Sequence, residues 1–384
     1  MKIRKILPVL LPLMVALASC GATPAGDSTI QGPADFAEVT PFTIRAVASL
    51  DEPWALAVVP GCDCALVTEK KGKLKLVTLA DGVVQDVSGA PSVAYGGQGG
   101  LGDIAVSPHF AKDGLVYLTW AEAGTSDTRG AALGRARLVR DGGVARLDGL
   151  SVIWRQSPKV AGRGHYGHRI AFSPGGKYLF LSSGERQKMT PAQDLAGNLG
   201  KVLRLLPDGT SAPGNPWAAK GGVSAEIWSY GHRNPLALMF GGDGRLWDVE
   251  HGPAGGDEIN LVKPGTNYGW PLVSNGNHYD GRAIPRHATR SDLAGPALSW
   301  NPVIAPGGAI ICRCRSFPAW QGQVLIAALG AQGLVRVGID GDRARELARY
   351  NMEARMRAIA EGGDGRLWML EDGAKGRLLQ LKPR

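Results

Sequence analysis

Long apolar runs and charged residues are both scarce in this sequence. Charged residues make up 20% of the 384 residues, and hydrophobic residues make up 44%. So large a share of apolar side chains excludes a disordered chain, and the apolar stretches are too short for a membrane protein with several spans. We therefore expect a large soluble globular body.

Runs of basic residues and helical periodicity are also missing. The formal net charge is +9, but it is spread along the chain without the block of five or six like charges that is typical of interaction tails. We therefore expect no nucleic-acid partner, and instead a small anionic ligand held by a few arginines. No window of about 12 or more residues has a helical period, which favours strands.

Cysteines are few, and one of the five ends an N-terminal leader. Basic residues at 2–5 precede an apolar stretch at 6–18, which is too short to span a bilayer but suits a secretory signal. The small residues before Cys20 resemble a bacterial lipoprotein signal. We expect residues 1–19 to be removed, Cys20 to be lipidated at the periplasmic side of the outer membrane, and residues 20–40 to form a flexible tether. An ordinary secretory signal is the alternative.

The other four cysteines form two close pairs, Cys62 with Cys64 and Cys312 with Cys314. Export favours disulfides, and a single intervening residue argues against a zinc site. Each pair could bridge internally or to a partner strand, and the sequence leaves the pairing open.

Glycine and proline, in contrast, are abundant. Together they make up about 21% of the chain, against roughly 12% in average proteins. They separate apolar runs that recur as six predicted hairpins, at 54–58 with 65–69, 102–106 with 115–119, 169–172 with 178–181, 236–240 with 245–250, 309–311 with 324–328, and 356–360 with 366–368. Such repetition predicts an all-β, six-bladed β-propeller over residues 41–384. Two β-sandwiches are the alternative.

Two long stretches, 186–199 and 271–307, do not fit a strand pattern. Long loops that persist in a compact body are often functional. In a propeller such loops converge at the mouth of the central channel. We therefore expect the functional site at that mouth.

Polar residues also occur just before the first strand of several predicted hairpins. Taken singly, each can be explained as a turn cap or as part of a solvated strand face. Their shared placement instead predicts that they meet at the channel mouth, and they are Gln98, His165, Arg233, Asn234, Arg355 and Arg357.

The order of these motifs resembles that of the PQQ-dependent soluble aldose sugar dehydrogenases of the glucose/sorbosone dehydrogenase family. The resemblance extends from about Val47 to Leu381 and is most specific between Gly231 and Pro271. It implies a six-bladed propeller that oxidises aldose sugars at the anomeric carbon to lactones. Hydride would pass to PQQ, and electrons would then pass to an external acceptor.

The resemblance also implies a role for each polar residue. His165 matches the catalytic base, for which a neutral histidine is suited. Arg233 matches the residue beside the reactive carbonyl of PQQ, and Arg355 and Arg357 match the clamps for its carboxylates. Gln98 and Asn234 match residues that make minor polar contacts with the cofactor.

Calcium is the second cofactor that the resemblance implies. One Ca²⁺ would lie against PQQ and the backbone carbonyls of Gly252 and Pro253, because this ion prefers oxygen ligands. A second, structural Ca²⁺ is implied by Glu258 and by the carbonyl of Tyr268.

Two positions depart from the family pattern. Gly330 stands where the family commonly places a lysine against PQQ, and the loss of that charge should weaken cofactor binding by about 1–3 kcal/mol. His168 stands where a small residue is usual, close to the expected sugar contacts.

The sequence is also compatible with two other functions. A non-catalytic propeller lipoprotein could bind a glycan or a protein partner with the same mouth. A metal-dependent lactonase would need a ring of acidic and amide side chains, and the sequence offers only scattered candidates such as Glu69 and Glu250.

Overall fold

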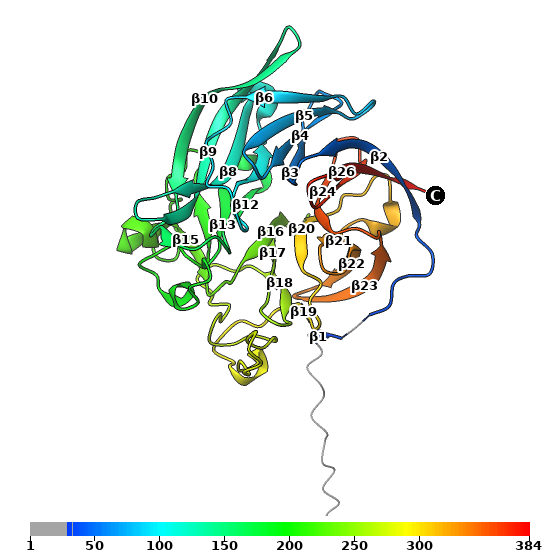
Figure 1. Cartoon of the computed structure of the whole chain (residues 1–384). Helices are drawn as coiled ribbons and strands as arrows, with labels where there is room; N and C mark the ends of the chain where they lie inside the picture. Colours follow the sequence, from blue (N-terminus) through cyan, green and yellow to red (C-terminus); the bar gives the residue numbers. More distant parts are fainter. Residues whose placement is uncertain (1–28, 33) are drawn as a thin grey trace, which may run out of the picture.

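The structure is a computed structural model that describes residues 29–32 and 34–384. The predicted signal segment and Cys20 lie outside these residues. No helix in the described part of the chain is long and apolar enough to cross a membrane. β-Strands are the main secondary structure of the described residues, as predicted (Figure 1).

Helices are few and short among the described residues, which agrees with the missing helical periodicity. They are α1 (Phe110–Asp113), η1 (Pro174–Gly176), η2 (Thr190–Gln193), η3 (Ala218–Lys220), η4 (Gly222–Glu226), η5 (His287–Thr289) and η6 (Pro318–Trp320).

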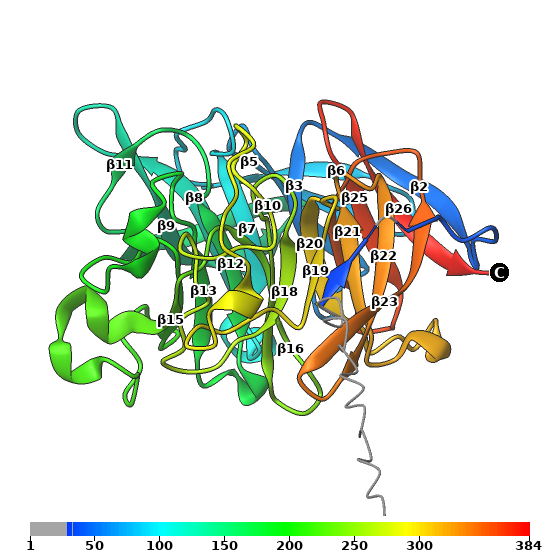
Figure 2. The same ribbon diagram turned by 90° about the horizontal axis from the view of Figure 1, so that it is seen from below.

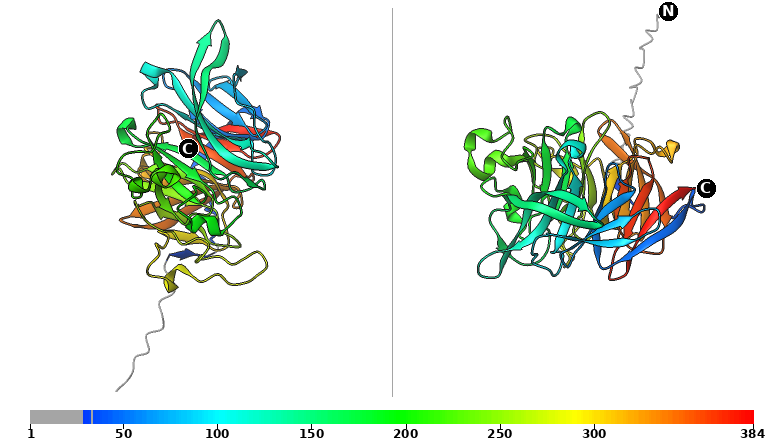
Figure 3. Two further views of the ribbon diagram at one scale, coloured as in Figure 1. Left: turned by 90° about the vertical axis from the view of Figure 1, so that its left-hand side faces the viewer. Right: turned by 90° about the horizontal axis from the view of Figure 1, so that it is seen from above.

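The strands form five hydrogen-bonded sheets around a central axis, and Figure 2 shows them side-on. The largest sheet joins two units through a parallel pairing of β6 with β10. Its strands are β3 (Pro53–Val58), β4 (Cys64–Glu69), β5 (Lys73–Thr78), β6 (Val84–Ser88), β7 (Leu101–Val106), β8 (Leu115–Ala123), β9 (Thr128–Asp141), β10 (Val144–Arg155) and β11 (Val160–Ala161). The β9–β10 hairpin projects beyond the ring (Figure 3).

The other four sheets follow in chain order. One contains β12 (Gly167–Phe172), β13 (Leu179–Ser183), β14 (Lys201–Leu205) and β15 (Ile227–Tyr230). The next contains β16 (Pro235–Phe240), β17 (Leu246–Glu250), β18 (Asp257–Leu261), β19 (Leu298–Trp300) and β1 (Ile30–Gln31). The last two contain β20 (Pro306–Ile311), β21 (Val324–Ala328), β22 (Gly333–Asp340) and β23 (Arg343–Asn351), and then β24 (Met356–Glu361), β25 (Leu367–Glu371), β26 (Gly376–Pro383) and β2 (Phe42–Leu50).

All six predicted hairpins are confirmed as antiparallel pairs: β3 with β4, β7 with β8, β12 with β13, β16 with β17, β20 with β21, and β24 with β25. The first strands of these pairs are innermost, and they contact one another in a closed order, β3, β7, β12, β16, β20, β24 and β3 again. Each of them begins at the same end of the ring.

Face-to-face packing of neighbouring sheets explains the unbroken apolar runs. Strands β4, β13, β17, β21 and β25 are buried at every position, because a sheet lies against each of their faces. The core therefore lies between the sheets, where Trp247, Trp300 and Trp368 are fully buried.

Two segments near the N-terminus complete sheets that are otherwise built from distant parts of the chain. Strand β2 pairs with β26 along its whole length, from Phe42 opposite Pro383 to Leu50 opposite Gly376, so the last sheet contains both ends of the ring. Ile30–Gln31, inside the expected tether, pairs with β19. The remaining boundaries of the leader and the tether stay predictions.

The expected loop at 271–307 is wrong over Leu298–Trp300, which form β19, and at its end, because β20 already begins at Pro306. The prediction missed this strand because three residues are too few to show an alternating pattern. The loop at 186–199 is confirmed and contains only the short helix η2.

Arg169 crosses the centre of the ring. From β12 it donates to Asp103 of β7 at 3.0 Å and to the carbonyl of Gly307 of β20 at 2.5 Å, and its guanidinium lies 3.8 Å from the ring centroid of Trp54. Arg169 and Asp103 are both buried, so Arg169 links innermost strands from different parts of the ring.

Both disulfides are internal to their pairs. Cys62 bonds to Cys64 and Cys312 to Cys314, with Cα–Cα distances of 5.2 and 4.9 Å. They lie at the far ends of β4 and β20 from the mouth where the innermost strands begin.

Candidate functional site

A cleft opens at the end of the ring where the innermost strands begin. It brings together four of the six predicted cofactor and catalytic residues, Gln98, Asn234, Arg355 and Arg357, from segments far apart in the sequence. Its walls also include Lys70, which was not predicted from the sequence. None of the described residues that line the cleft is an aspartate or a glutamate. We call this site the cation-lined cleft.

His165 lies beside the cleft, held by two partners. Its backbone N–H donates to Oε1 of Gln98 at 2.7 Å, and its Nδ1 lies 2.5 Å from Oε1 of the buried Glu185. A protonated Nδ1 that donates to Glu185 leaves Nε2 as the ring nitrogen that can accept a proton. Burial, together with the charge of Arg233, lowers the pKa of His165 although Glu185 acts to raise it, so the ring is neutral at pH 7.

Close backbone packing positions this pair. A Cβ on Gly184 would lie 2.2 Å from the carbonyl oxygen of His165, so only glycine fits before Glu185. The carboxylate of Glu185 also accepts the backbone N–H of Met189 at 2.5 Å. Glu185 was not predicted as a site residue, because its only signal in the sequence is its place after a buried strand, β13.

Arg233 and Asn234 are anchored through their backbone. Oε2 of Glu250 accepts the N–H of Arg233 at 2.7 Å and that of Asn234 at 3.2 Å. The guanidinium of Arg233 donates to the carbonyl of His251 and to the hydroxyl of Tyr279. Its buried Nε has no hydrogen-bond partner, so a ligand oxygen could satisfy it.

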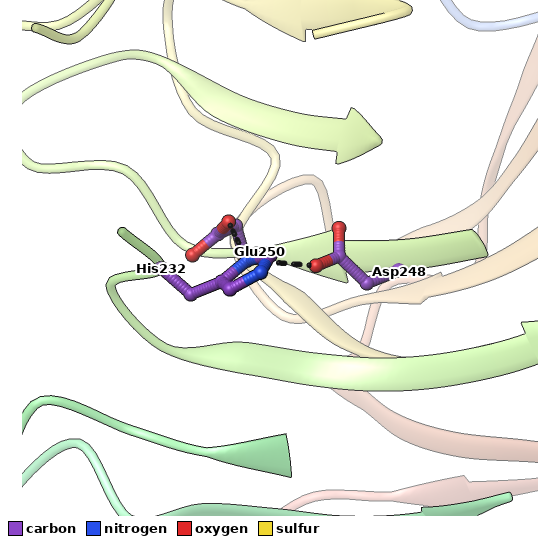
Figure 4. A group of neighbouring side chains, drawn as sticks. All are labelled: His232, Asp248 and Glu250. Atoms are coloured by element: carbon purple, nitrogen blue, oxygen red, sulfur yellow. Dashed lines mark hydrogen bonds and ion pairs between the residues drawn. The ribbon is translucent and has the colours of Figure 1, made fainter. Parts of the chain in front are cut away.

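A buried histidine and two carboxylates support this anchor (Figure 4). Nδ1 of His232 lies 3.1 Å from a carboxylate oxygen of Asp248 and 3.1 Å from one of Glu250. Burial alone would lower the pKa of His232, but the hydrogen bonds to Asp248 and Glu250 raise it to about 9. A protonated His232 thus holds Glu250 in the position that accepts from Arg233 and Asn234.

Arg355 and Arg357 share one carboxylate. Both nitrogens that Arg357 directs at Asp372 lie within 2.9 Å of Oδ1, whereas Arg355 reaches Oδ2 at 3.3 Å. Although burial acts to raise the pKa of Asp372, the charges and hydrogen bonds of the two arginines lower it. Arg355 is the more exposed of the two, so it is free to meet a ligand.

His168 lines the same cleft but carries no charge. It is packed between Trp54 and Tyr166, with ring centroids 4.9 and 5.8 Å away, and burial lowers its pKa to about 3. Its buried Nδ1 has no hydrogen-bond partner. His168 therefore cannot replace a missing cation, but it can exchange a hydrogen bond with a ligand.

Gly330 does not line the cleft. Its N–H donates to the carbonyl of Ile304, and an added Cβ would lie 3.0 Å from Ala305 and Ile304. The neighbouring Leu329 faces the cleft instead. No cation reaches the cleft from this turn after β21.

A smaller pocket adjoins the cleft and shares His251 with it. It contains all four residues predicted to bind calcium, Gly252, Pro253, Glu258 and Tyr268, as well as Arg233 and Glu250. We call it the carboxylate-lined pocket. Glu250 and Glu258 face each other across β17 and β18.

The backbone of this pocket is tightly packed, as a carbonyl-lined ion site requires. A Cβ on Gly252 would lie 2.2 Å from the carbonyl oxygen of Gly256, and the N–H of Gly252 donates to Asp257 at 2.9 Å. Glu258 already contacts Nε2 of His287 at 3.0 Å. This set of carboxylate and carbonyl oxygens fits a calcium ion.

The two acidic residues considered for a lactonase do not form a ring. Glu69 accepts the backbone N–H of Asp51 at 2.8 Å, and Glu250 accepts those of Arg233 and Asn234. Both carboxylates thus serve to hold the backbone.

Comparison with known proteins agrees with this geometry. The family model described as glucose/sorbosone dehydrogenase matches residues 50–380. Aldose sugar dehydrogenase YliI of Escherichia coli (strain K12) is 37% identical over 341 residues, which cover 87% of this chain and 91% of the relative.

Solved structures show the same similarity in three dimensions. The soluble aldose sugar dehydrogenase of Escherichia coli in its apo-form has a TM-score of 0.85 and 35% identity, and the match covers 89% of this chain and 100% of that chain. The PQQ-bound form of aldose sugar dehydrogenase from Streptomyces coelicolor has a TM-score of 0.74 and 29% identity, with 89% and 98% covered.

Proposed function

The chain belongs to the glucose/sorbosone dehydrogenase family, and from this premise we propose that it is a PQQ-dependent aldose sugar dehydrogenase. The observation that carries the proposal is the His165–Glu185 pair beside the cation-lined cleft. The reaction we propose oxidises an aldose at its anomeric carbon to the lactone. The two electrons taken from the sugar then pass to an external acceptor.

The cation-lined cleft supports PQQ as the cofactor. Arg355 and Arg357 would hold its carboxylates, because the planar guanidinium matches a carboxylate. Gln98 and Asn234 would add polar contacts, and the buried Nε of Arg233 offers a donor for a carbonyl oxygen. When bound, PQQ supplies the acceptor for the hydride that leaves the anomeric carbon.

His165 supplies the base in this proposal. Its Nε2 would accept the proton of the anomeric hydroxyl as the hydride leaves the carbon, so the sugar loses one hydride and one proton, which are two electrons and two protons in all, and becomes the lactone. Glu185 keeps the other ring nitrogen protonated and stabilises the imidazolium that forms. The positive charge of Arg233 favours negative charge that develops nearby.

The carboxylate-lined pocket supports calcium. The carbonyls of Gly252 and Pro253 would hold one ion at the edge of the pocket that meets the cleft. Glu258 and the carbonyl of Tyr268 would hold a second ion that stabilises the fold. Both assignments rest on the donor set, because hard cations prefer oxygen ligands.

We also infer a six-bladed propeller and an exported, lipid-anchored protein. The six innermost strands and their hairpins support six blades, although the pairing of β6 with β10 merges two of them into one sheet. The leader at residues 1–19, Cys20 and the two disulfides support export. Lipidation at Cys20 and the outer-membrane destination stay predictions.

The test adds PQQ and Ca²⁺ to purified apoprotein and follows the reduction of a dye with a panel of aldoses. We expect dye reduction, and retention of PQQ absorbance after desalting. If neither is observed, the proposed enzymatic function is wrong. The alternative would then hold, a non-catalytic propeller lipoprotein that binds a glycan or protein. The ordered His165–Glu185 pair favours the enzyme, since simple binding does not need a base.

A further inference from the structure

Lys70 lies in the turn between β4 and β5 and lines the cation-lined cleft together with Gln98, Asn234, Arg355 and Arg357. We propose that Lys70 binds a carboxylate of PQQ and is, with Arg355 and Arg357, the third cation that holds the carboxylates of the cofactor. This inference rests on the proposed function of the same cleft. Lys70 would supply a positive charge that the turn after β21, which contains Gly330, does not bring to the cleft.

Lys70 has no carboxylate partner among the described residues. Its Nζ donates to the carbonyl of Gly97 at 3.2 Å and lies 5.9 Å from the ring centroid of Tyr95. The next residue is different, since Lys71 contacts both carboxylate oxygens of Asp51 within 2.9 Å. The charge of Lys70 is therefore available to a ligand, whereas that of Lys71 is neutralised.

The charge of the cleft calls for an anion with several carboxylates. Lys70, Arg355 and Arg357 are three cations, and among the described residues Asp372 is the one carboxylate that pairs with any of them. Two positive charges therefore remain in a cleft whose described walls hold no acidic residue. A trianionic cofactor would compensate them, and a neutral sugar would not.

The backbone of Lys70 is held firmly while its side chain stays free. Its N–H donates to the carbonyl of Glu52, its own carbonyl accepts from Leu101, and both distances are 3.0 Å. A Cβ on Gly100 would lie 2.1 Å from that carbonyl oxygen, so the two segments pack closely. Only the side chain of Lys70 needs to move for Nζ to leave the carbonyl of Gly97 and donate to a ligand carboxylate.

The test measures the affinity of the apoprotein for PQQ in the presence of Ca²⁺ by equilibrium dialysis. The variants are Lys70→Gln and, as the matched control, Lys71→Gln, with Arg357→Gln as the benchmark for a clamp. We expect Lys70→Gln to weaken binding by about 10- to 100-fold, as for a lost charge-assisted bond. Lys71→Gln should bind as the wild type does, and Lys70→Arg should restore most of the affinity.

Ionic strength gives a second readout that does not depend on turnover. Removal of a cation that contacts the ligand makes the affinity less sensitive to salt. We expect a shallower salt dependence for Lys70→Gln than for Lys71→Gln. If both variants bind PQQ as tightly as the wild type, the role of Lys70 is overturned while the proposed function stands. If the wild type binds no PQQ, both are overturned.

Discussion

The cation-lined cleft and the carboxylate-lined pocket share His251 but have opposite chemistry. The described walls of the cleft carry Lys70, Arg355 and Arg357 and no acidic side chain, whereas the pocket carries Glu250 and Glu258. One site suits a polyanion and the other suits a hard cation. Because the two sites share His251, an anion bound in the cleft and a cation bound in the pocket would be neighbours.

The backbone from His232 to Asn234 connects the two sites. Glu250 belongs to the pocket, yet its carboxylate holds the N–H groups of Arg233 and Asn234. Asn234 lines the cleft and Arg233 lines the pocket. Variants should therefore separate the chemical step, cofactor binding and calcium binding.

Replacing the base should separate chemistry from both ligand sites. We expect His165→Ala to lower kcat by about 100- to 10,000-fold, because proton abstraction is lost. PQQ affinity and the effect of Ca²⁺ on the melting temperature should stay those of the wild type. The control is His109→Ala, an exposed histidine far from the cleft. Turnover that survived in His165→Ala would assign the base to another residue.

Changing the partner of the base should alter the pH profile. Burial and Arg233 lower the pKa of His165, and Glu185 opposes them. Because the neutral ring is the active form, the rate should fall only as the pH drops below His165's ordinary range near 6.5. Glu185→Gln removes the opposing charge, so the acid limb of kcat/KM should move to lower pH and kcat should fall by about 10-fold. An acid limb that did not move would mean that another group sets it.

Removing calcium should destabilise the carboxylate-lined pocket. An ion present at 100 times its Kd stabilises a folded protein by about 2.7 kcal/mol. We therefore expect a chelator to lower the melting temperature of the wild type and to have a much smaller effect on Glu258→Gln. The exposed Glu353→Gln is the matched control. A chelator effect of wild-type size in Glu258→Gln would exclude this carboxylate as a ligand.

Reducing the disulfides should have the smallest effect on cofactor binding and turnover. Each joins residues only two positions apart, so by the chain-entropy account each contributes roughly 1.5 kcal/mol. Both lie at the opposite ends of their strands from the two sites. We expect a small drop in melting temperature under reductant, with thiols counted to verify reduction, and no change in PQQ affinity. A large loss of affinity would indicate long-range coupling.

Much of the fold could be read from local patterns. The six hairpins are confirmed because a buried strand, a glycine-rich turn and a second buried strand leave a signal within about 20 residues. The strand β19 and the pairing of β2 with β26 could not be read in this way. The first is too short to show a pattern, and the second joins segments more than 300 residues apart.

The polar residues of the site also divide into those that a local sequence motif identified and those that have no such motif. Motifs before the first strands identified Gln98, Asn234, Arg355 and Arg357, and the structure brings these four to one cleft. Lys70, Glu185 and Asp372 were missed, because each lies in an ordinary turn or at a strand end. Their importance depends on what faces them across the ring.

The strand class, the order of the hairpins and the residue types of the site follow from the amino-acid sequence. They depend on neighbours along the chain, where turn chemistry and burial act. Which charges stay unpaired depends instead on distances in space, and these come from the folded arrangement. Lys70 and Lys71 are adjacent and chemically identical, yet one faces the cleft and the other faces Asp51.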